Sequence, residues 1–197
     1  MLSAELLQRN IFIASTLRDE LPHVRGEVAR FLEQPGVGIR IIRSEMPGFS
    51  KGLTNRHKHD LCLDWVDETP KFILIVDKWA GRDFEGEDSK YSEYLGSTIT
   101  HAETRHALKK SHGFYWFVSA SVIHAYNLWS HEKNREIRGS VYWDIDIPVF
   151  ELIADLKGRN ICDPVVFTEL IDLKPKVAAA LGLNVVESQQ LAPEIRQ

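Results

Sequence analysis

The sequence contains few of the features that mark secreted, membrane-spanning or metal-binding proteins. Its 197 residues include only two cysteines, Cys62 and Cys162, which cannot form a disulfide framework and lack metal-ligand spacing. No apolar run approaches the roughly 18 residues of a membrane span, and the first residues lack the basic start of a signal peptide. We therefore expect a protein of the reducing cytoplasm with no membrane partner.

A surplus of positive charge is also absent. The chain has 24 lysines and arginines against 28 aspartates and glutamates, which gives a net charge of −4. Proteins that bind duplex nucleic acid usually carry a basic surplus, so nucleic acid is not an expected partner. The hydrophobic fraction of 44% is typical of a globular protein, and the length suits one well-packed domain with room for an appendage.

The chain does have a regular alternation of apolar runs and helical spacing. Unbroken runs such as Ile11–Ala14 and Phe72–Val76 suit strands buried on both faces, as in parallel sheets flanked by helices. The alternation predicts a three-layer, doubly wound α/β domain with a mostly parallel sheet of four to five strands. The predicted strands are about 11–15, 37–42, 72–76 and 114–118, and the predicted helices are about 21–34, 57–66, 99–110 and a segment around 122–129.

The pattern changes beyond residue 138. The elements predicted there are a last strand at 140–145, a helix at about 148–157, and a helix from residue 163 or 164 to residue 180. Gly182 follows as a typical helix stop. We therefore expect an α/β domain, a helical C-terminal extension packed on it, and a tail or linker, which cover residues 1–138, 139–183 and 184–197.

Glu103 is the leading candidate for chemistry. With about 100° of rotation per residue, it lies on the same helix face as Ile99 and His106, toward the sheet. An unpaired buried charge is costly, so this carboxylate must be hydrogen-bonded or belong to a site. Two interpretations stay open. Glu103 is an acid, base or nucleophile at the carboxyl edge of the sheet, or it forms a capping box with the amide of Thr100.

The loop after the first strand is the second candidate site. The chain lacks the G-x-G-x-x-G and P-loop motifs, but Ser15, Thr16, Arg18 and Asp19 lie between a predicted strand and helix. Hydroxyls and free amides at such a position can hold phosphate or ribose oxygens. The same residue types are also ordinary turn and cap residues, so this alternative remains.

The third candidate is the segment 77–97, which follows the strongest predicted strand and has no apolar period. Loops of this length are usually lids, binding loops or disordered segments. Trp79 could stack on a base while Lys78 and Arg82 meet phosphate. The alternative is a lid that packs its own aromatic residue.

Metal and nuclease chemistry are weaker hypotheses. The histidine groups around His57 and His101 lack the spacing of a zincin helix, so no metal is expected. Asp155-Leu156-Lys157, which follows Asp144 and Asp146 in the chain, resembles a nuclease D-x-K triplet only faintly. A metal-dependent nuclease is therefore the third functional hypothesis.

Several stretches occur in a recognisable order. They are Ile11–Asp19 followed by Arg25, then Cys62–Val66, Phe72–Val76 and Gly81, and finally Ser97–Glu103 and Phe117–Val118. Together they resemble the "IFISST" opening, the hydrophobic centre, and the "S-I-T-x-x-E" helix start of a family of TIR-like domains. That family carries a domain-of-unknown-function label and is often fused to bacterial signalling or defence NTPases.

The resemblance implies a fold and an activity. The family is similar to TIR domains and nucleoside deoxyribosyltransferases, which share a flavodoxin-like sheet and use a glutamate at this helix on an N-glycosidic bond. It therefore implies that Glu103 is the catalytic carboxylate of an enzyme that cleaves NAD or another nucleotide, without a separate cofactor, in prokaryotic defence or stress signalling. The residues implied to bind the substrate are Ser15, Thr16, Arg18, Asp19, Trp79, Arg82 and Thr100.

The chain departs from the family pattern before the loop glycine, where Trp79 and Ala80 stand in place of arginine and tyrosine. The loop is also longer and more acidic than in the family. The alternative function is a non-enzymatic, TIR-like interaction module that forms a homo-oligomer or senses a nucleotide for a fused or partner effector.

Overall fold

The computed structural model describes residues 9–16, 23–34, 38–50, 55–110, 113–131 and 144–183. The strands are β1 (Asn10–Ser15), β2 (Arg40–Ile42), β3 (Lys71–Val76), β4 (Gly113–Ser119) and β5 (Val165–Phe167). The helices are α2 (His23–Leu32), α3 (Lys58–Glu68), the 3₁₀ helix η1 (Ser89–Tyr94), α4 (Ile99–Lys109), α5 (Ala120–Ser130), α7 (Ile147–Gly158) and α8 (Leu170–Ala180). None of these helices has the length and apolarity that crossing a bilayer requires.

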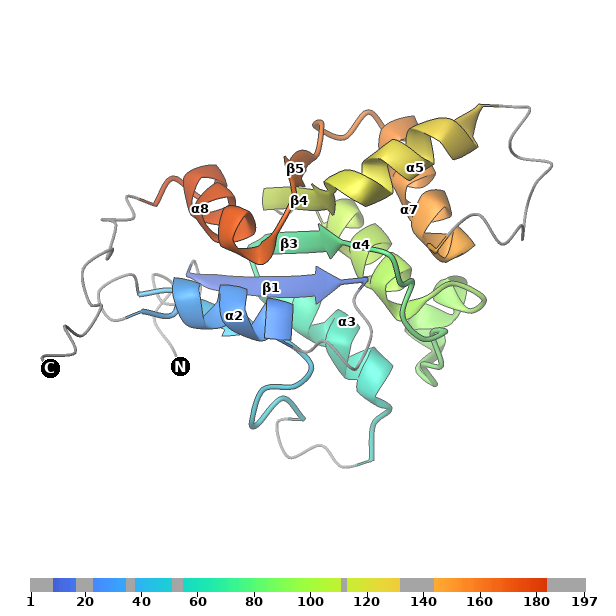
Figure 1. Ribbon diagram of the computed structural model, residues 1–197. Coiled ribbons are helices and arrows are strands. Elements are labelled where there is room, and N and C mark those ends of the chain that lie inside the picture. The colour runs from blue at the N-terminus through green and yellow to red at the C-terminus, as the bar shows by residue number, and fades with distance from the viewer. Residues whose placement is uncertain are drawn as a thin grey trace, which may run out of the picture.

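The five strands form one parallel sheet in the order β2-β1-β3-β4-β5. This order is that of flavodoxin-like folds, in which the chain reverses direction across the sheet next to β1. The predicted three-layer α/β fold is therefore confirmed, with five strands that are all parallel. The carboxyl ends of the strands meet at a single edge, toward which the arrowheads of β1 and β3 point (Figure 1).

Helices cover both faces of the sheet (Figure 1). On one face, Ile11, Ile13 and Ile73 pack with α2 and α8, and on the other, Phe12 and Phe72 pack with α3, α5 and α7. Alternate residues of a strand point to opposite faces, so β1 buries every side chain and β3 buries every side chain except that of Lys71. This burial explains why β1 and β3 are unbroken apolar runs in the sequence.

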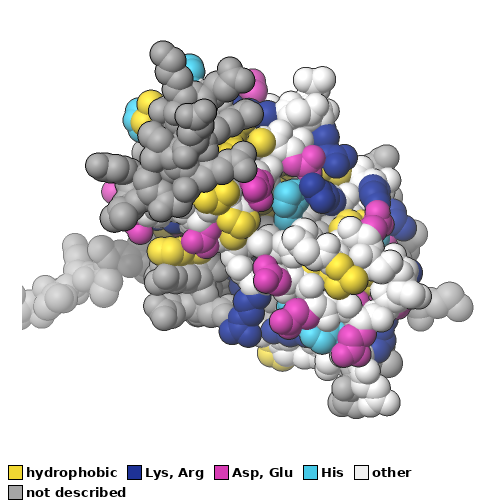
Figure 2. Space-filling model, turned by 90° about the vertical axis from the view of Figure 1, so that its right-hand side faces the viewer, with side chains coloured by type: hydrophobic (Ala, Val, Ile, Leu, Met, Phe, Trp, Pro, Cys, Tyr) yellow, Lys and Arg dark blue, Asp and Glu magenta, His cyan; other side chains and the backbone are white. Residues whose placement is uncertain are grey.

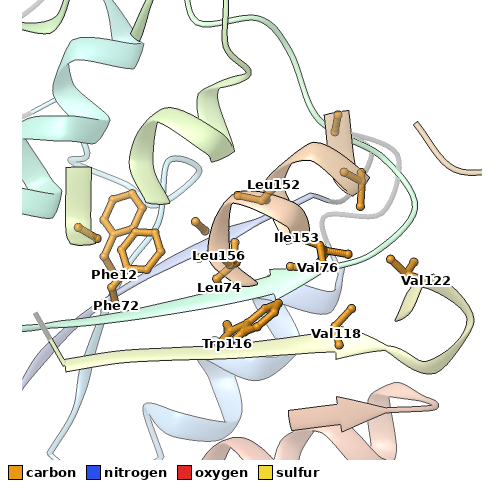
Figure 3. Close-up of a cluster of buried hydrophobic side chains, with 14 of the residues drawn as sticks. Phe12, Phe72, Leu74, Val76, Trp116, Val118, Val122, Leu152, Ile153 and Leu156 are labelled. Carbon is orange, nitrogen blue, oxygen red and sulfur yellow. The ribbon is translucent and has the colours of Figure 1, made fainter. Parts of the chain in front are cut away.

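The close-up of the second face shows how α7 contributes to the core (Figure 3). Leu152, Ile153 and Leu156 of α7 lie against the side chains of Leu74 and Trp116 from the central strands. The described part of α7 therefore packs on the sheet. The boundary predicted at residue 138 falls among residues outside the described ranges and stays a prediction, as does the tail at 184–197.

Two element predictions near the C-terminus are wrong. Val165–Phe167, expected within a helix, forms the edge strand β5, and α8 begins only at Leu170. Asp144 and Ile145 are not in a strand, and the rest of the strand predicted at 140–145 lies outside the described residues. The β-branched residues Val165 and Val166 favour pairing of β5 with β4. The indole Nε1 of Trp116 in β4 also donates to the carbonyl of Cys162 at 2.6 Å and so holds the chain that leads into β5 beside β4.

The segment 77–97 is folded onto the domain. Its aromatic residues Phe84, Tyr91 and Tyr94 are buried in one cluster with Leu63 of α3 and Ala102 of α4. Its backbone is also tied down, because a carboxylate oxygen of the buried Asp60 accepts the amides of residues 87 and 88 at 3.0 and 3.1 Å. The segment packs three of its own aromatics, and Trp79 is not one of this cluster.

Candidate functional site

A cleft of about 420 Å³ opens at the carboxyl edge of the sheet. Its walls come from the end of β1, the loops after β2 and β3, one residue of α2, and the first turns of α3 and α4. Ligands of open α/β sheets bind at this edge. Figure 2 shows the molecule from this side, where lysine, arginine, acidic and histidine side chains lie close to one another.

Glu103 lies in the wall of this cleft and is only 6% exposed. No salt bridge joins it to any residue that the structure describes. Burial raises its pKa to about 8, against the opposing charge of Arg25 and a hydrogen bond from the thiol of Cys62. Near neutral pH, the side chain of Glu103 is therefore mostly a protonated carboxylic acid. It loses this proton as the pH rises through about 8.

The capping-box alternative for Glu103 is wrong. The N-cap of α4 is Thr98, whose hydroxyl oxygen accepts the amide of His101 at 3.3 Å. Thr100 instead donates its hydroxyl to the carbonyl of Ser15 at 3.0 Å and so joins α4 to the end of β1. Because the helix begins at Ile99, Glu103 lies in its second turn, beyond the reach of a cap.

Ser15 and Thr16 have different surroundings although they are neighbours. The hydroxyl of Thr16 donates to the carbonyl of Asp77 at 2.8 Å and accepts the Asp77 amide at 2.6 Å, so it links the ends of β1 and β3. Ser15 lines the cleft, is 4% exposed, and its Oγ has no partner among the described residues. A buried hydroxyl without a partner is unfavourable, and a ligand in the cleft can supply the missing bond.

Three cationic side chains line the cleft. Arg25 of α2 forms an ion pair with Glu45, while its buried Nε has no partner among the described residues. Lys58 begins α3 and is exposed, and Arg82 comes from the loop after β3. Arg18 and Asp19, predicted to bind substrate, lie outside the described residues. Lys58 was not predicted as a site residue, and Arg25 was named only as part of the family motif.

Trp79 and Arg82, predicted to act together, are separated in the structure. Arg82 and Gly81 line the cleft, and Gly81 adopts a φ of 82°, a conformation that favours glycine. Trp79 is not among the lining residues, and its amide donates to the Thr16 carbonyl at 3.1 Å. The prediction that its indole meets a base therefore finds no support in its position.

The residues of the nuclease hypothesis do not form a common site. Asp144 pairs with Lys78 at 2.8 Å, and Asp146 accepts the amide of Ala80 at 3.0 Å, so both tie α7 to the loop after β3. Lys157 lies 5.0 Å from the ring of Tyr126, near the other end of α7. At 1.5 Å per residue, this helix separates it from Asp146 by roughly 16 Å.

His57, His59 and Glu85 bring potential metal-ligand atoms within 4.8 Å of one another. However, Nδ1 of His57 accepts the His59 amide at 3.2 Å, and Nδ1 of His59 accepts the Glu85 amide at 2.9 Å. Burial lowers the pKa of His59, and a neutral ring with an accepting Nδ1 carries its proton on Nε2. Coordination through Nε2 would move this proton to Nδ1 and break the two amide contacts. One of these contacts lies at the start of α3, and the other holds the loop after β3 at Glu85.

The fold and the cleft define a class: a flavodoxin-like α/β protein with a buried carboxyl group in a polar cleft at the carboxyl edge of its sheet. Residues 10–182 match the profile of the domain of unknown function DUF4062, and the chain belongs to that family. No curated protein matches the chain.

Proposed function

We propose that this protein cleaves, or transfers at, the N-glycosidic bond of a nucleotide such as NAD, as TIR domains and nucleoside deoxyribosyltransferases do. The observation that carries the proposal is the buried carboxyl of Glu103 in the wall of the cleft, without a salt bridge to any described residue. A strongly shifted acid in a cleft is a common property of catalytic sites. The role implied for prokaryotic defence or stress signalling rests on the motif resemblance alone.

The chemistry of this bond suits such a group. When the bond between ribose C1′ and the base nitrogen breaks, its electron pair leaves with the base and the sugar becomes an oxocarbenium ion. A carboxylate beside C1′ stabilises this cation or traps it covalently, and then accepts a proton from the attacking water. A cationic base in the cleft favours the ionised form of Glu103, whose pKa of about 8 lets it change charge near neutral pH.

The charges and hydroxyls around Glu103 support a phosphorylated ligand. Arg25, Lys58 and Arg82 line the cleft together with Glu45, which forms an ion pair with Arg25. A protonated Glu103 adds no negative charge near neutral pH. Arginine and lysine are the side chains that proteins use to bind phosphate. The unpartnered hydroxyl of Ser15 then supplies a bond to ribose or phosphate oxygen.

The direct test replaces Glu103 with glutamine, which has the same shape but cannot ionise. Chromatography of NAD incubated with purified protein should show that Glu103→Gln releases nicotinamide at least about 100-fold more slowly than wild type, the usual range for loss of a proton-transfer group. Glu151→Gln, at an exposed position of α7, is the matched control and should keep full activity. Release by Glu103→Gln at the wild-type rate would contradict the proposal.

One observation favours a second function, a non-enzymatic interaction module. β5 is the last strand of the described sheet, and Val166 on it and Ile171 on the following helix are 39% and 78% exposed. Exposed apolar side chains near a sheet edge suit self-association. Light scattering combined with an NAD-consumption assay separates the two functions, because an oligomer that never consumes nucleotide supports the module.

A further inference from the structure

A second hollow adjoins the cleft on the side of the loop after β2. It has a volume of about 340 Å³ and shares Ser44 and Lys58 with the cleft. The two hollows therefore meet at these two side chains. Binding sites for small molecules usually span about 300–1,000 Å³, so each hollow can hold a small ligand by itself, and the two together can hold an extended one.

The lining of the second hollow differs from that of the cleft. Its apolar part consists of Met46, Phe49 and Leu61, which belong to or pack against the main core cluster. The backbone of Phe49 is held in place, because the indole Nε1 of Trp65 donates to its carbonyl at 2.7 Å. Flat rings bind well on such a surface, and the thioether of methionine makes favourable contacts with aromatic rings.

The two cations of the second hollow have different partners. Arg56 forms ion pairs with Asp64 and Asp88, so its charge is already balanced within the protein. Lys58 forms no ion pair with any described residue, and it lies where the hollows meet. A phosphate at this junction would receive the charge of the Lys58 ammonium group, whereas the hydroxyl of Ser44 already donates to Glu45 at 2.9 Å.

We infer that the ligand is a dinucleotide or a similar nucleotide conjugate, with its glycosidic bond at Glu103, its linking phosphates at Lys58, and a second ring over Met46. This inference rests on the proposed function for the first half of the ligand. Ser15 and Glu103 contact the reacting nucleoside, Lys58 binds the phosphates, and Met46 selects substrates that carry a second half. The second hollow thus acts as a specificity site beside the reacting one.

The test measures binding without turnover, by calorimetric titration of the Glu103→Gln protein with NAD and with nicotinamide mononucleotide. Both probes carry the same reacting half. We expect NAD to bind about tenfold more tightly or better, since a charge-assisted contact and a stacked ring add roughly this much affinity. In this background, Met46→Gln should reduce the preference for NAD, and Lys58→Met should weaken both probes, because the mononucleotide keeps one of the linking phosphates. Lys71→Met, at the opposite end of β3, should leave both affinities unchanged.

The outcomes separate this inference from the proposed function. Equal affinities for the two probes, no binding of either probe, or equal weakening of both by Met46→Gln overturns the two-part ligand. Tight NAD binding by Glu103→Gln together with no cleavage by wild type supports the two-part ligand and contradicts the glycosidic function. Cleavage of the mononucleotide as efficiently as NAD supports that function and overturns the two-part ligand.

Discussion

Helix α4 carries three buried ionisable side chains, and two of them differ sharply from the third. His101 contacts a carboxylate oxygen of Asp155 at 3.2 Å. His106 lies between the hydroxyl of Tyr94 at 3.0 Å and the carboxylate of Asp67 at 2.8 Å. Both histidines therefore have polar partners that satisfy their rings, and neither lines the cleft.

Glu103, one turn before His106, has no such partner in the described part of the chain. Its polar contact is the thiol of Cys62, which remains protonated because burial and the charge of Glu103 raise its pKa well above the usual value. Burial lowers the pKa of His101 and His106, while Asp155 and Asp67 oppose that shift. The comparison indicates that the histidine pairs hold α4 to α7 and α3, whereas Glu103 is available to a ligand.

The largest expected effect on stability comes from removing a buried side chain that has hydrogen-bond partners. His106→Ala removes packing and leaves Asp67 and the Tyr94 hydroxyl without their shared partner, so we expect a loss of about 2–4 kcal/mol in the free energy of unfolding. Urea denaturation measures this loss. His124→Ala, at an exposed position of α5, is the control and should change stability little. A loss below about 0.5 kcal/mol for His106→Ala would remove the structural role assigned to this pair.

The next effect has the opposite sign and depends on pH. The pKa of Glu103 is about 8 in the folded protein against a usual value of 4.5, so the folded state holds a proton that the unfolded state loses. The wild type therefore loses stability as pH rises through this window, by roughly a few kcal/mol once the window is passed.

Glu103→Gln has no such titration and should be more stable than wild type at pH 9, with little advantage at pH 5. Urea denaturation of the two proteins at pH 5 and pH 9 measures this difference in stability. Groups that titrate in the same way in both proteins contribute equally to each and cancel in the difference. An equal difference at the two pH values would mean that Glu103 ionises normally in the fold.

The smallest effect compares two adjacent hydroxyls. Thr16→Val removes two hydrogen bonds between β1 and β3 and should cost about 1–2 kcal/mol in stability, whereas Ser15→Ala should cost little or nothing because its hydroxyl has no partner among the described residues. Ligand affinity should reverse the order, with Ser15→Ala the weaker binder. Thermal unfolding with and without NAD measures both quantities, and a stability loss for Ser15→Ala equal to that for Thr16→Val would show that Ser15 is structural.

Much of the fold could be predicted from the apolar pattern. β1, β3 and β4 are buried on both faces and are therefore continuous apolar runs, and α4 has a clear helical period. β5 was missed because it has three residues, of which only Phe167 is buried. An edge strand with one buried side chain leaves almost no periodic signal, and its pairing with β4 depends on residues far away in the chain.

The candidate site was only partly predictable. The rotation of about 100° per residue along the helix was enough to place Glu103 on the buried face of α4. The position of Ser15 at the end of a predicted strand was enough to make it a candidate. The convergence of Arg25, Lys58 and Arg82 was not predictable, because these residues come from α2, α3 and the loop after β3. Nothing in local spacing indicates which residues of separate elements meet at one edge of a sheet.

The sequence by itself therefore determined most of the strands and helices and the burial of one carboxyl, since apolar periodicity follows from which face of each element is covered. Only the tertiary structure decided what surrounds that carboxyl. The parallel sheet brings the ends of β1 and β3 together. The hydroxyl of Thr16 makes two hydrogen bonds that join these ends, whereas Ser15 lines the cleft that also contains Glu103. Hydrogen-bond partners are assigned in three dimensions, so two neighbouring hydroxyls with the same local propensities acquire different roles.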